Sequence, residues 1–331
     1  MSRIAIACGL AVLVYAEGAL AQGAIIDSQC RSGSSVERAT QDACQKTVDI
    51  FAFMAPQLSA SLIGGSAVLG EVRSLGGFGH LSLGIRGNVM RARLPDVDAI
   101  VPDVTGARSN KFAVEDKPLG LPVVDLAVGI LPGVDLGDVS ILGIDALVNV
   151  AWIPEVTEGD LTVRLPDGSL KLGLGARVTV IEESAFGPSI ALSFLQRDLP
   201  RIDIHATPGS DELRVSQLTL TSDAWRAAVG KSLGPLQVSI GAGKDRFDAS
   251  ATIDVNVNRA GHSYQRGDVL VAQSMRRQTV FADLALNLSA LRIVAEVGQV
   301  SGGSVVTYNT FDGKRADDSL QFGSLGVRVR W

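Results

Sequence analysis

The histidines are the first candidates for chemistry in this sequence. The chain has three, His80, His205 and His262. A histidine beside a serine or a carboxylate can act as a general base in hydrolysis. Asp203 and Asp211 lie close to His205 in the chain, but carboxylates near a histidine are also ordinary in polar loops, and no spacing suggests a Ser–His pair. We therefore expect no enzyme, and a hydrolase is the minor alternative.

Charged side chains at alternate positions of several segments are the second candidate. They alternate with apolar residues, so in an extended strand the charges share one face and the apolar residues share the other. A polar face of this kind could line a passage that selects solutes by charge. The alternative is a core of paired charges, which the mixture of signs favours. The candidate lining residues are His80, Arg86, Asp125, Asp145, Lys171, Arg177, Arg197, Asp283, Arg292, Glu296, Arg328 and Arg330.

Residues 1–21 have the features of a secretory signal peptide. Arg3 supplies the positive charge, an apolar stretch follows, and Ala19-Leu20-Ala21 forms a small-x-small cleavage site. The net charge of −5 offers no basic field for nucleic acid. Export places Cys30 and Cys44 in an oxidising compartment, so we expect a disulfide. A metal site there would need further ligands, and none is nearby; no cofactor is expected.

The alternation of apolar and polar residues recurs from residue 77 to the end of the chain. The strand at 139–152 ends on Trp152, which suits an aromatic girdle at a membrane interface. No apolar stretch is long enough for a spanning helix, so a membrane protein of this sequence must be a closed barrel. We expect an all-β fold, an antiparallel transmembrane barrel of about ten strands over 77–331. The first strand is expected near 78–92, a strand with less regular alternation at 212–231, and a long loop near 257–276. A break at Ser222-Asp223, together with a second additional strand to keep the number even, would give twelve.

Residues 22–76 form a separate segment before the barrel. A helical pattern covers 31–62, and Pro56 is expected to break or bend that helix. Because the segment precedes the first strand, we expect it in the periplasm or in the barrel mouth. Two roles stay open for it: a periplasmic cap, or a plug inside the lumen.

The final strand carries a resemblance to a known class of proteins. Leu325, Val327 and Val329 share one face with Trp331, which ends the sequence. This pattern resembles the C-terminal strand of Gram-negative outer-membrane proteins, although Gly323 stands where another large residue is common in that class. The resemblance implies an outer-membrane location, contact with outer-membrane lipid and recognition of this strand by the barrel-assembly machinery.

These features predict a narrow channel or transporter for small or apolar solutes. The Gly-rich approach to the first strand resembles that of the plugged long-chain fatty-acid transporters of the outer membrane. The alternative is a structural or surface-binding barrel with an occluded lumen. The sequence does not name the solute.

Overall fold

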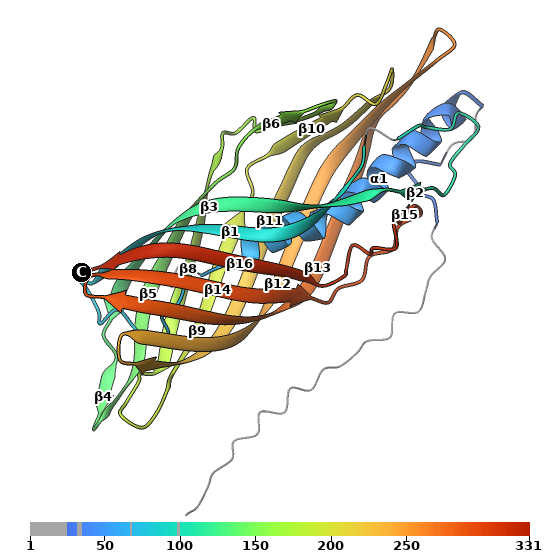
Figure 1. Ribbon diagram of the computed structural model, residues 1–331. Helices are drawn as coiled ribbons and strands as arrows, with labels where there is room; N and C mark the ends of the chain where they lie inside the picture. The colour runs from blue at the N-terminus through green and yellow to red at the C-terminus, as the bar shows by residue number, and fades with distance from the viewer. Residues whose placement is uncertain (1–24, 32–34, 67, 98–99) are drawn as a thin grey trace, which may run out of the picture.

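The wall of the molecule is a closed ring of antiparallel strands, shown in the computed structural model (Figure 1). The described residues are 25–31, 35–66, 68–97 and 100–331, so the predicted signal peptide lies outside them. Each strand pairs with the next, and the last pairs with the first, which closes the ring. Ten strands form it: β1 (Leu81–Pro95), β3 (Val114–Leu131), β5 (Val139–Trp152), β8 (Leu170–Ile181), β9 (Ser189–Asp198), β11 (Glu212–Leu233), β12 (Leu236–Arg259), β13 (His262–Leu288), β14 (Leu291–Ser301) and β16 (Leu320–Arg330).

The two ends of the ring differ in their connections. The short-connection end carries Trp331, whose backbone pairs with Leu81, and the turns 132–138, 182–188, 234–235 and 289–290. The long-connection end carries the segments 96–113, 153–169, 199–211 and 302–319. Six short strands are not part of the ring: β2 (Lys111–Phe112), β4 (Val134–Leu136), β6 (Val156–Glu158), β7 (Leu161–Arg164), β10 (Ile202–Ala206) and β15 (Thr310–Phe311).

The outer surface of the ring carries an apolar belt. Every second residue points outward, and in the belt most of these residues are apolar and exposed. A closed barrel with such a belt satisfies its backbone hydrogen bonds internally and offers apolar side chains to lipid. This confirms the predicted class, a transmembrane β-barrel of the outer membrane. The belt includes Ile85, Val124, Leu174, Leu192, Ile240, Val280, Leu284, Val297 and Leu325.

In the three longest strands, the apolar side chains change from the outer to the inner face beyond the belt, toward the long-connection end. We call this end of the ring the upper end. On β12, Val238 and Ile240 point outward near the short-connection end, while Arg246 and Asp248 point outward further along. The inner face changes in the opposite sense, and Phe247 is fully buried there. The upper parts of β11, β12 and β13 therefore have the polar outside and apolar inside of a protein domain in water.

This reversal corrects one expectation from the sequence. A long loop was expected near 257–276, but β12 and β13 instead form one hairpin with a tight turn at Ala260-Gly261. Buried side chains such as Val257 and Val269 find an apolar core inside the ring, so the strands continue beyond the membrane. β11 also runs without a break through Ser222-Asp223.

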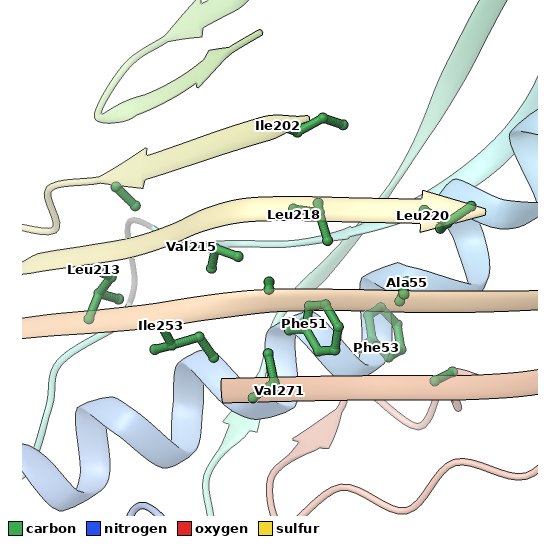
Figure 2. Close-up of a cluster of buried hydrophobic side chains, with 14 of the residues drawn as sticks. Phe51, Phe53, Ala55, Ile202, Leu213, Val215, Leu218, Leu220, Ile253 and Val271 are labelled. Carbon is green, nitrogen blue, oxygen red and sulfur yellow. The ribbon is translucent and has the colours of Figure 1, made fainter. Parts of the chain in front are cut away.

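Helix α1 (Ser35–Ile63) supplies the other half of that core. It lies inside the ring toward the long-connection end (Figure 1) and packs chiefly against β11, β12 and β13. Figure 2 shows Phe51, Phe53 and Ala55 of the helix meeting side chains of the upper strands. Phe53 also stacks on Phe311 at a centroid distance of 4.1 Å. The upper strands and α1 thus bury each other's apolar faces.

Pro56 does not break the helix, which was one of the two effects expected of it. The helix continues to Ile63 although a proline lacks an N–H and crowds the preceding turn. Gln57 Nε2 donates a hydrogen bond to Phe53 O beside the proline and another to Arg93 O of β1. Burial of Phe53 and Ala55, which both precede the proline, offsets the local cost.

The expected disulfide joins Cys30 to Cys44, with a Cα–Cα distance of 5.6 Å. Both cysteines are buried against the upper core. Changing both to serine is expected to cost the N-terminal segment about 3 kcal/mol, because the bridge closes a short loop. Hydrogen exchange should quicken in α1 and stay slow in β14 and β16. Equal loss of protection in those two strands would show that the bridge holds the barrel itself.

The belt predicts a strong position effect for a new charge. Leu174→Arg places a cation in the belt and should cost about 2–4 kcal/mol in a bilayer. Thr219→Arg is the matched control, because Thr219 also points outward but lies above the belt among polar residues. Urea unfolding in lipid vesicles measures both. Equal tolerance of the two changes would mean that Leu174 does not face lipid.

Candidate functional site

The interior of the ring is filled by residues 62–75, which we call the lumen segment. It continues from α1 toward the short-connection end, where β1 then begins. Residue 67 lies outside its described part. Leu62 and Ile63 are the last residues of α1, and apart from short turns at 66–71 the described residues after them form neither helix nor strand. Their backbone groups must find other partners once buried, because an unpaired buried N–H or C=O is costly.

Charged side chains of the wall supply those partners at the upper end of the lumen segment. Arg86 Nη1 donates to Gly64 O at 2.8 Å. Arg197 Nη2 donates to Gly65 O at 2.8 Å, and its Nη1 donates to Leu62 O. Glu296 Oε1 accepts a hydrogen bond from Gly65 N at 2.7 Å. The wall therefore binds this backbone with both signs of charge.

Glu71 is the centre of the lower half. Its side chain is buried and forms ion pairs with Arg330 at 2.7 Å and Arg292 at 3.1 Å. Its backbone oxygen accepts a hydrogen bond from Arg177 Nη1 at 2.7 Å. Arg328 Nη1 donates to Leu69 O at 3.1 Å nearby. Four arginines from β8, β14 and β16 thus converge on one carboxylate and the adjacent backbone.

Three further contacts fix the segment where it reaches the short-connection end. Asp145 Oδ1 accepts from Leu75 N at 3.0 Å, and Glu182 Oε1 accepts from Ser74 N at 2.8 Å. Arg330 Nη2 donates to Leu75 O at 2.8 Å. The lumen segment is therefore held by wall side chains along its described length.

The wall charges also pair with one another. Arg86 lies 2.5 Å from Asp125, Arg177 lies 2.7 Å from Asp145, and Arg226 lies 3.0 Å from Glu296. The members of the first two pairs are almost completely buried. Removing one member of such a pair leaves a charge without its counter-ion in a closed interior.

The predicted lining residues other than His80 lie in this interior. His80 precedes β1 and is exposed at the short-connection end, with Nδ1 3.3 Å from Gly77 O. It is therefore not on the inner wall, because β1 begins at Leu81 and not near residue 78, where the first strand was expected to begin. Lys171 is only half-buried. Asp283 is buried and accepts a hydrogen bond from Ser239 at 2.9 Å.

Two members of the network were missed from the sequence. Glu71 lies between two glycine-rich segments, 64–67 and 76–77, whose composition predicts flexible connectors. Its carboxylate amid apolar residues was the available signal. Arg226 lies in the strand whose alternation was least regular. Its inward position follows once Trp225, Ala227 and Val229 are taken as the outward row.

A small cavity lies beside the lumen segment. The cavity beside Leu62, Arg86 and Arg197 has a volume of about 10 Å³. A cavity of that size holds about one water molecule.

The remaining candidates from the sequence lie elsewhere. His205 Nε2 lies 2.7 Å from Glu212 at the long-connection end, where both side chains are partly exposed. In the described ranges, no group of three His, Cys, Asp or Glu residues could hold a metal ion. None of the described helical residues makes a helix long and apolar enough to cross a membrane. Trp152 and Trp331 are half-exposed at opposite ends of the wall, as a pair of aromatic girdles requires.

Comparison with known proteins gives little beyond this geometry. No family model matches the chain, and no curated protein matches it. Among solved structures it is similar to neisserial surface protein A, with a TM-score of 0.28 and 10% identity over 76% of this chain and 97% of that one. It is also similar to OccAB3 of Acinetobacter baumannii, with a TM-score of 0.18 and 9% identity over 76% and 99% of the two chains. Because these scores are low, the assignment of the fold rests on the strand pairing and the apolar belt.

Proposed function

We propose that this chain is an outer-membrane barrel closed by its own N-terminal segment, and that it works at the cell surface through its long-connection end. The observation that carries the proposal is the use of the wall charges. Residues that could line a passage, such as Arg86, Arg177 and Arg197, instead bind the backbone of residues 62–75. A side chain that is committed to a buried backbone partner is not available to select a passing solute.

The orientation follows from the connections. In barrels of this class the short turns face the periplasm and the long loops face outward. The long-connection end, with the water-adapted upper parts of β11, β12 and β13, is then extracellular. Residues 25–31 lie at that end, because Gln29 Nε2 donates to Leu270 O at 2.6 Å and Arg266 Nη1 donates to Gln29 O at 2.7 Å. The N-terminal segment then crosses the lumen from outside to inside and acts as a plug.

The surface role is structural or binding, and no enzymatic role is proposed. The loop 302–319 is fixed to the plug helix, since Asp49 Oδ2 accepts from Asn309 N at 2.8 Å and from Asn309 Nδ2 at 2.6 Å. Anchored loops on a rigid support suit recognition of a partner. The strand β16, with Trp331, is the part that the assembly machinery would bind during insertion.

Planar-bilayer recording tests the closed state. The purified wild-type protein is expected to give almost no steady conductance, because the described lumen is packed with paired charges and backbone. A large, steady wild-type conductance would contradict the proposal. It would favour the narrow channel or transporter for small or apolar solutes that the sequence also predicts.

A further inference from the structure

Two cations on the outer surface of the ring stand directly above the apolar belt. Lys244 on β12 and Arg276 on β13 both point away from the lumen and are exposed. Neither forms a hydrogen bond or ion pair with another residue in the part of the chain that the structure describes. Both long side chains are free to bind a ligand from outside the protein.

The register of the strands gives their height relative to the membrane. Ala242 and Val280 are opposite each other and form the last apolar row of the belt on these strands. Lys244 is the next outward-facing residue of β12 after Ala242, and it lies opposite Trp225 of β11. Trp225 is 60% exposed, and an outward tryptophan at the edge of the belt marks the interface between lipid tails and headgroups. Lys244 and Arg276 therefore lie at the level of the headgroups.

Arg276 has a residue of like charge opposite it on the neighbouring strand. Arg276 is directly opposite Arg246, and like charges opposite each other destabilise a pair of strands. Arg246 is compensated, because it forms an ion pair with Asp248 at 3.1 Å and has Asp223 as its neighbour on β11. Lys244 and Arg276 receive no such compensation from the protein. An anion bound by Lys244 and Arg276 would offset the repulsion between Arg276 and Arg246.

We propose that Lys244 and Arg276 bind a phosphate group of a phosphorylated glycolipid in the outer leaflet. The two residues are diagonal neighbours on adjacent strands, about 7–8 Å apart at the backbone, so both side chains reach a single phosphate. Arginine and lysine are the usual partners of phosphate groups. Trp225 is placed to contact the apolar part of the same lipid. The assignment to the outer leaflet rests on the orientation given under the proposed function.

Binding of lipid A to the full-length protein in phosphatidylcholine vesicles tests the site. The double variant Lys244→Gln/Arg276→Gln is expected to bind lipid A roughly 10–30-fold more weakly than the wild type, because each cation contributes about fivefold near an anionic surface. Arg214→Gln/Arg315→Gln is the matched control, since it removes two exposed cations away from the belt and should leave the affinity unchanged. Heat-modifiable migration on a gel confirms that both variants are folded.

Three results would overturn the inference. They are wild-type affinity in the double variant, equal binding of dephosphorylated lipid A, and displacement of lipid A by inorganic phosphate alone at comparable concentration. Vesicles present lipid at both ends of the barrel, so the assay does not depend on orientation in the cell. Lipid A binding in vesicles, together with residues 25–31 found in the periplasm, would overturn the outer-leaflet assignment and the proposed orientation while the phosphate site stands.

Discussion

Replacing Arg177 with alanine is expected to destabilise the folded barrel by about 3–5 kcal/mol. Arg177 is almost completely buried and lies 2.7 Å from Asp145 Oδ2. The change leaves the Asp145 carboxylate without its cation inside the closed ring. It also removes the hydrogen bond to Glu71 O, which holds the lumen segment to β8. Urea unfolding in vesicles should show the loss, and bilayer recording should show a higher conductance than the wild type.

The control for this variant is Arg214→Ala. Arg214 also forms an ion pair, at 2.8 Å from Glu212, but its side chain is about half-exposed. An exposed pair of this kind contributes about 0–1 kcal/mol. If Arg177→Ala were as stable as Arg214→Ala and changed only the ion preference of an already large conductance, the lumen would be an open passage. The proposed plug would then be wrong.

An epitope inserted immediately before Ile25 is expected to bind antibody on intact cells. The physical reason is the path of the chain. Residues 25–31 contact Arg266 and Leu270 near the tip of the β12–β13 hairpin, whereas β1 begins at the opposite end of the ring. The lumen segment must therefore cross the barrel between them. Flow cytometry on intact and permeabilised cells measures the difference, which is close to all-or-none.

The matched control is the same epitope beside Phe186, in the turn that joins β8 to β9. Phe186 is fully exposed at the short-connection end, so the insertion should not disturb the fold. This epitope should become accessible only after permeabilisation. The reverse pattern would place residues 25–31 in the periplasm and would contradict the orientation.

The sequence by itself determined the wall of this protein. Alternation with a period of two directs one row of each strand to lipid and the other row inward. Because this pattern depends only on residues that are close in the sequence, it can be recognised without the structure. It placed β5 at 139–152 and β16 at the end of the chain, and it put Leu174 outward and Arg177 inward. The disulfide between Cys30 and Cys44 followed from export and from the lack of another partner.

Only the tertiary structure decided what the inward charges contact. A pattern of period two shows that Arg86 and Arg197 share a face, but it cannot show that their partners are the backbone oxygens of Gly64 and Gly65. Those partners lie more than twenty residues away in a segment without regular secondary structure. The upper strands posed the same difficulty, because Val257 and Val269 reverse the inside–outside pattern only where α1 lies inside the ring. Burial against a distant helix, and not local periodicity, sets where these strands end.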